Sequence, residues 1–205
     1  MANRAYLVGS ENADTAGPNE QGINYDPDTE IFAGASYHLP IFWLSIFDES
    51  HLKTHAIAEH KIETFVADAD TVKRLLSQRR AAVLATFPQC ESHWNAWTQL
   101  ITEAPFKFFK IDATEIWELD PDQLKQRLPG AVRWFSSKSD ADFAQLLATA
   151  EVPLIKPRGL LGSLLGGTPR GYDPKTKNLT VAKDSSVGHH LHGYSWVRET
   201  PWKDE

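Results

Sequence analysis

Alternating apolar and polar positions along the chain predict a domain that contains both strands and helices. Short apolar stretches at 3–8, 61–67 and 106–111 have the length and residue types of strands. Asp70 is expected to cap a helix of roughly 16 residues that ends before Pro88. A second helix is expected from 92 to about 103, because its tryptophans recur at helical spacing.

Further elements follow in the second half of the chain. The Asp-Pro pair before residue 121 predicts a helix over 121–128 that Pro129 and Gly130 stop. A strand is expected over 132–135, and then a helix capped by Ser139 or Asp140 that runs to about residue 150. The apolar run at 41–47 is core, either as a buried strand or as a buried helix.

Two long stretches lack regular periodicity. Residues 9–30 are polar with glycine and proline breakers, and residues 152–179 are rich in the same two residue types. We therefore expect a single globular domain over 1–205, of the α+β or α/β class. Its sheet is expected to be mixed, with several helices, an acidic loop over 9–30 and a Gly/Pro-rich loop over 152–179.

The charge of the chain is unevenly distributed. The whole sequence carries 21 basic and 27 acidic side chains, a net charge of −6, whereas the first 60 residues alone hold nine acids and two bases. Such a field repels nucleic-acid phosphates and attracts basic protein surfaces. The sequence contains no apolar run of transmembrane length, and one cysteine in 205 residues fits a reducing compartment, so we expect a cytoplasmic protein without nucleic-acid or membrane partners.

Asp68 and Asp70 form the pattern that most suggests catalysis. A strand delivers two carboxylates, one residue apart, to the start of a helix, where they could bind Mg²⁺ or attack a phosphoryl group. The segment resembles the first motif of haloacid-dehalogenase-type phosphatases, which implies a nucleophile at Asp68 and a general acid at Asp70. Asp140 and Asp142 repeat the spacing before another helix, however, and acids at helix starts are stabilised by the free N–H groups. Helix capping is the preferred interpretation.

Histidines near the C-terminus suggest a metal site. His189, His190 and His192 could place two imidazoles on one side of an extended segment, with Asp173 or Asp184 as a further ligand. No zinc-binding spacing completes the set, so we expect neither a metal nor another cofactor. Cys90 and His93 are a second pair to consider, as a thiolate and imidazole at a helix start.

Two short pieces carry a family resemblance. The opening Met1 to Leu7 and the later Pro40 to Leu44 are similar to a group of bacterial proteins that begin MANRxYL. The small, acidic, aromatic-rich chain also resembles bacterial toxin-immunity proteins in general character. That resemblance implies a cytoplasmic binding protein with no activity of its own.

The leading functional hypothesis is therefore a non-enzymatic immunity protein that binds and neutralises a basic toxin domain. The expected contact residues combine acids for electrostatic attraction with aromatic rings for buried area, namely Tyr25, Asp26, Asp28, Glu30 and Phe32. The alternative is a metal-dependent hydrolase or phosphatase that uses Asp68 and Asp70. A scaffold protein with another kind of partner is a third possibility.

Overall fold

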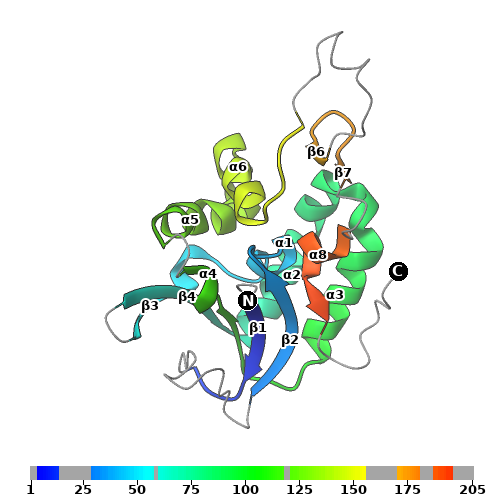
Figure 1. The fold of residues 1–205 in the computed structure, drawn as a ribbon. Helices are drawn as coiled ribbons and strands as arrows, with labels where there is room; N and C mark the ends of the chain where they lie inside the picture. The colour runs from blue at the N-terminus through cyan, green and yellow to red at the C-terminus, as the bar shows by residue number, and fades with distance from the viewer. Residues whose placement is uncertain are drawn as a thin grey trace.

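A computed structural model of the chain has one main sheet, one small hairpin and several helices (Figure 1). It describes residues 4–13, 29–57, 60–117, 121–155, 170–180 and 187–195. The strands are β1 (Arg4–Ser10), β2 (Thr29–Ser36), β3 (Leu52–Ile57), β4 (His60–Asp68), β5 (Phe108–Asp112), β6 (Gly171–Asp173), β7 (Asn178–Thr180) and β8 (Tyr194–Ser195).

The main sheet has six strands in the order β3-β4-β5-β1-β2-β8. Each neighbouring pair in this order is antiparallel, so the expectation of a mixed sheet is wrong, whereas the α+β class is confirmed. The reason is that β4 follows β3 and pairs antiparallel with it, and that β5 then pairs antiparallel with both β4 and β1. In the described part of the chain, the parallel pairing is an isolated bridge between Leu154 and Tyr172, beside the hairpin of β6 and β7.

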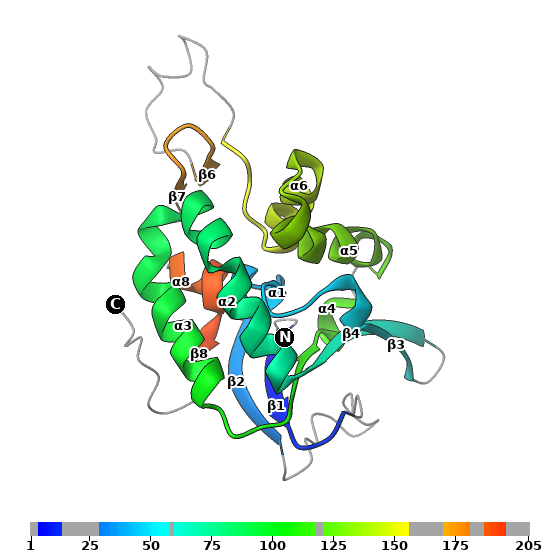
Figure 2. The ribbon, with the colours of Figure 1, turned by 180° about the vertical axis from the view of Figure 1, so that it is seen from behind.

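Two long helices, α2 (Ala69–Thr86) and α3 (Glu91–Glu103), cover one face of the sheet (Figure 2). The other helices of the described residues are α1 (Ile41–Leu44), α4 (Thr114–Trp117), α5 (Pro121–Ser137), α6 (Asp140–Thr149) and α8 (Val187–His192). Figure 2 shows α2 and α3 in front of the sheet, with α5 and α6 packed together to one side. The core therefore forms between the sheet and the helical layer.

The apolar run at 41–47 is a short helix and a turn at the centre of this core. All of its side chains are buried. The carbonyl groups at its end are satisfied by Arg79 of α2, whose guanidinium donates to the oxygens of Ser45 and Phe47, each at 2.7 Å. Arg79 also pairs with Asp48 and lies 5.0 Å from the ring centroid of Phe135. The buried guanidinium group of Arg79 thus stabilises the turn that ends this segment.

Helix α2 begins two residues earlier than expected. Asp68, rather than Asp70, is its N-cap, because the Asp68 side chain accepts a hydrogen bond from the backbone of Thr71. The inward stripe of α3, formed by Trp94, Trp97 and Ile101, is confirmed.

Helix α5 continues through Pro129 to Ser137, so the predicted stop and the predicted strand over 132–135 are both wrong. Proline removes one backbone donor but keeps a helical φ, and the buried side chains of Leu128 and Val132 hold the next turn against the core. Gly130 permits close packing on α6: a Cβ there would lie 1.8 Å from Oε1 of Gln145.

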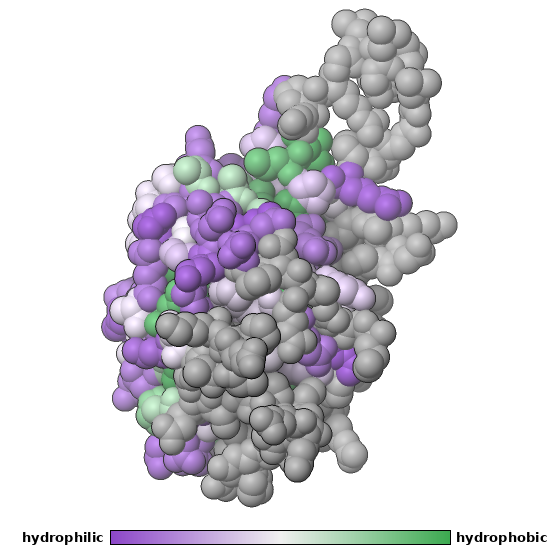
Figure 3. Space-filling model, turned by 60° about the vertical axis from the view of Figure 1, so that its left-hand side comes forward, coloured by the Kyte–Doolittle hydropathy of each residue, from purple (hydrophilic) through white to green (hydrophobic). Residues whose placement is uncertain are grey.

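Both predicted loops are shorter than expected. The first is flanked by the ends of β1 and β2, so residues 9–10 and 29–30 belong to strands, and its centre lies outside the described residues. The second contains β6 and most of β7, which ends at residue 180. The coloured surface in Figure 3 is largely hydrophilic, and Tyr37 and Leu154 are the large apolar side chains that the described residues expose most. No helix in the described ranges has the length and hydropathy to span a bilayer.

Candidate functional site

The two aspartates singled out in the sequence differ in their surroundings: Asp68 caps a helix, and Asp70 is exposed to solvent. Both oxygens of Asp68 face Thr71: Oδ1 accepts from the backbone N–H and Oδ2 from the hydroxyl, each at 2.8 Å. These hydrogen bonds lower the pKa of the Asp68 carboxyl. Asp70 is exposed in the first turn of α2. Among the residues that the structure describes, no three His, Cys, Asp or Glu side chains converge as a metal site.

The expected partner-binding residues are only partly described. Tyr25, Asp26 and Asp28 lie outside the described residues, and Glu30 is placed in β2 by its backbone alone. Phe32 is 3% exposed and packs against Phe106 and Phe109, with ring centroids 5.8 and 5.6 Å away. Phe32 is therefore a core residue and cannot supply contact area to a partner, because its ring is buried against other aromatic rings.

The C-terminal histidines lie on a helix, α8, and not on an extended segment. The ring of His190 stacks on that of His38 at 4.9 Å, and its Nδ1 lies 3.0 Å from the carbonyl oxygen of Ala150. The Nε2 of His192 instead lies 3.1 Å from Nδ1 of His93. Two of the three imidazoles thus have different histidine partners, since the helical turn directs them apart.

Cys90 does not form a reactive pair with His93. Its side chain is buried, and burial raises the pKa of the thiol to about 12. A thiol with such a pKa stays protonated at neutral pH and is a poor nucleophile. His93 has His192 as its partner.

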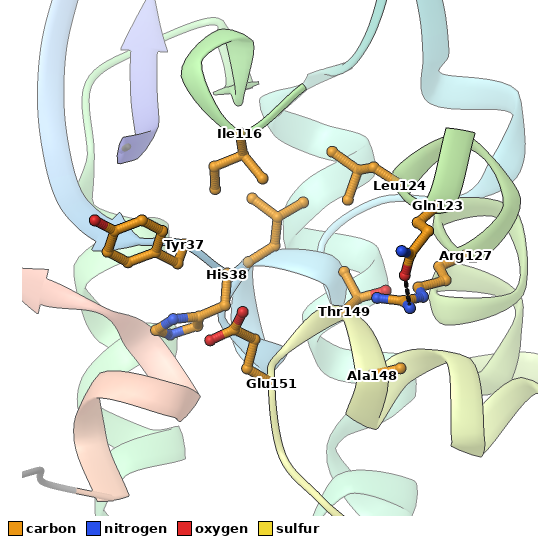
Figure 4. Close-up of a pocket in the computed structure, with 10 residues that line it drawn as sticks. Tyr37, His38, Ile116, Gln123, Leu124, Arg127, Ala148, Thr149 and Glu151 are labelled. Carbon is orange, nitrogen blue, oxygen red and sulfur yellow. Dashed lines mark hydrogen bonds between the residues drawn. The ribbon is translucent and has the colours of Figure 1, made fainter. Parts of the chain in front are cut away.

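A pocket of about 220 Å³ lies where the turn after β2 meets the end of α6 (Figure 4). The backbone N–H of Leu39 donates to the carbonyl oxygen of Thr149 at 3.1 Å and joins the two segments. Helices α4 and α5 form the other walls. The lining residues are Tyr37, His38, Leu39, Ile116, Gln123, Leu124, Arg127, Ala148, Thr149 and Glu151.

Glu151 enters the pocket from an unusual backbone position. It follows the C-cap of α6 with a φ of 52°, and its N–H donates to the oxygen of Ala148, while that of Val152 donates to Leu147. This hydrogen-bond pattern is the Schellman motif, which usually has glycine at the position of Glu151. Tyr37, at the rim, also has a positive φ of 65°. Two side chains of the pocket are therefore held on strained backbone.

His38 forms a fixed wall of the pocket. Its Nδ1 lies 2.8 Å from the oxygen of Ser36, and its Nε2 lies 3.1 Å from the oxygen of His189. Burial lowers the pKa of the imidazole, although the two carbonyl groups act in the opposite direction. Because both ring nitrogens face backbone oxygens, neither is directed toward a substrate for proton transfer.

The pocket also contains one carboxylate and one guanidinium group. Burial raises the pKa of the Glu151 carboxyl, while the charges of His190 and Arg127 act to lower it. Arg127 donates to the side chain of Gln123 on the same helix. Together with the apolar side chains of Ile116 and Leu124, these groups give the pocket a lining that is both charged and apolar.

Sequence reasoning did not identify this pocket. It predicted the end of α6 near residue 150, which places Glu151 just after the helix, but nothing in the residue types indicates that Tyr37 and Arg127 lie nearby. Comparison of the chain with family models, with curated proteins and with solved structures gave no match.

Proposed function

We propose that the protein is a non-enzymatic binding protein that neutralises a basic partner, in the manner of a toxin-immunity protein. The observation that carries the proposal is the distribution of charge. The first 60 residues have a net charge of −7, whereas the remaining 145 hold 18 acidic and 19 basic side chains. Glu11, Asp48 and Glu49 form ion pairs with Lys107, Arg79 and Arg133. Most of the remaining negative charge belongs to the five acids of residues 14–30, a stretch without Lys or Arg, and such a segment accelerates encounter with a partner of the opposite sign.

The side chains that the sequence offers for catalysis support the same proposal, because they cap a helix, face backbone oxygens or are buried. The carboxylate of Asp68 caps α2, the two nitrogens of His38 face backbone oxygens, and the thiol of Cys90 is buried. Each of these groups already has a structural role that accounts for its position.

A growth assay tests this proposal. The reading frame next to the gene of this chain is expressed with and without the chain in a bacterial host. We expect the neighbouring product to arrest growth when alone, and growth to return when the chain is present. The triple variant D26K/D28K/E30K should restore growth poorly, whereas a D122K/D140K variant, which changes two exposed helical acids elsewhere, should act as the wild type does. Arrest that persists with the wild-type chain would contradict the proposal.

A further inference from the structure

The charges in the pocket of Figure 4 are not paired with each other. Within the described part of the chain, the carboxylate of Glu151 takes part in no hydrogen bond or ion pair, and Arg127 has its hydrogen bond with Gln123. Figure 4 shows the two groups on either side of Thr149, with the Glu151 carboxylate turned toward the His38 ring. A carboxylate and a guanidinium group that share one pocket without an ion pair leave both available to a ligand.

The position of Glu151 strengthens this argument. A glycine would complete the same Schellman motif without backbone strain, yet the chain places a charged side chain there, in the lining of the pocket. Strain at a residue whose side chain forms no hydrogen bond or ion pair with the described part of the chain is typical of positions retained for binding.

The rest of the lining indicates the size and polarity of the ligand. Leu39, Ile116 and Leu124 supply apolar contacts, and each is at most 8% exposed. A volume of about 220 Å³ is below the range of about 300–1,000 Å³ typical of pockets for drug-sized ligands, so it suits a metabolite the size of an amino acid.

We propose that this pocket binds a free α-amino acid with an apolar side chain. Glu151 accepts hydrogen bonds from the ammonium group, Arg127 donates to the carboxylate, and the side chain contacts Ile116 and Leu124. Two groups of opposite charge in one pocket complement both ends of a zwitterion, which favours an amino acid over a simple amine or acid. This site is independent of the acidic segment proposed to meet a protein partner.

Isothermal titration calorimetry of the full chain with L-leucine tests the proposal. We expect saturable binding of L-leucine, and at least tenfold weaker binding of N-acetyl-L-leucine, which lacks the ammonium group, of L-leucinamide, which lacks the carboxylate, and of glycine, which lacks the side chain. Absence of heat from L-leucine would overturn the proposal. Equal affinity for any of the three analogues would overturn it as well, since each lacks one of the groups that the pocket is proposed to recognise.

Variants of the two charged residues provide the second arm. E151Q and R127Q should each weaken L-leucine binding at least tenfold while the thermal unfolding curve keeps its shape. R74Q is the matched control, because Arg74 makes the same kind of contact with Gln78 on the exposed face of α2. Wild-type affinity in E151Q or R127Q would contradict the proposed contacts, and an equal loss in R74Q would show that the effect is unspecific.

Discussion

Leu39 donates its backbone N–H to the carbonyl oxygen of Thr149, and this 3.1 Å hydrogen bond lies between two strained residues. Tyr37 precedes Leu39 by two positions and Glu151 follows Thr149 by two, and both have a positive φ. A left-handed conformation costs a non-glycine residue on the order of 1 kcal/mol. The junction therefore places two residues with strained backbone at one pocket.

Glu151→Gly should stabilise the fold. Glycine adopts the left-handed position without strain, and this gain exceeds its greater freedom in the unfolded chain, so we expect the free energy of unfolding to rise by roughly 0.5 to 1 kcal/mol. Denaturant titration measures it. Lys177→Gly, at an exposed turn residue with a φ of 56°, is the control for strain relief away from the pocket. A less stable Glu151→Gly variant would mean that the carboxylate supports the fold.

Asp68→Ala should cost about 1 kcal/mol of stability, because it removes the cap of α2. Asp68→Ser should recover most of that loss, since a hydroxyl also accepts from the N–H of Thr71. The same proteins are assayed for Mg²⁺-dependent hydrolysis of an aryl phosphate. Turnover by the wild type that disappears in the well-folded Asp68→Ser variant would favour the phosphatase hypothesis over capping.

Arg79→Met should be far more damaging than a change at its neighbour. The guanidinium of Arg79 is 4% exposed and serves two buried carbonyl groups and Asp48, so its loss should cost about 3 to 5 kcal/mol. Arg80→Met removes an exposed pair with Glu91 and should cost less than about 1 kcal/mol. Chemical denaturation of both variants gives the comparison, and similar losses would refute the structural role of Arg79.

Stability should fall as the pH drops below neutrality. Burial lowers the pKa of His192 to about 4 from a usual 6.5, so between these values the unfolded chain binds more protons than the folded one. Neutral His192 thus costs the fold no stability above pH 6.5. As the pH falls from 6.5 toward 4, the free energy of unfolding drops by at most about 3 kcal/mol because of this residue. His38 and His190 act in the same direction. His192→Gln should flatten the dependence of the unfolding midpoint on pH, and an unchanged slope would exclude His192 as its source.

Local signals predicted the elements with strong periodicity. The tryptophan stripe of α3 and the serine cap of α6 follow from spacing and residue type alone. Pro129 and Gly130 misled the prediction, because packing of α5 on α6 outweighs the loss of one backbone hydrogen bond. The antiparallel order of the sheet depends on long-range pairing between β1 and β5, which no local pattern encodes.

The candidate site was predicted less well than the fold. Capping by Asp68 was anticipated as the preferred interpretation, although at the neighbouring aspartate. The pocket combines Tyr37, Arg127 and Glu151 from three separate segments, and the positive φ values that place two of them have no signature in these residue types. Sequence reasoning could therefore identify single residues and their local roles, but not the convergence of distant ones.

The association rate with the proposed basic partner, measured as a function of salt concentration, tests the proposed function most directly. Stopped-flow mixing of this chain with the purified product of the neighbouring gene measures this association rate. The account predicts a rate for the wild type that falls steeply with salt, and a slower rate with a flatter dependence for D26K/D28K/E30K. Identical rates and salt slopes for the two proteins would contradict recognition through the acidic N-terminal segment.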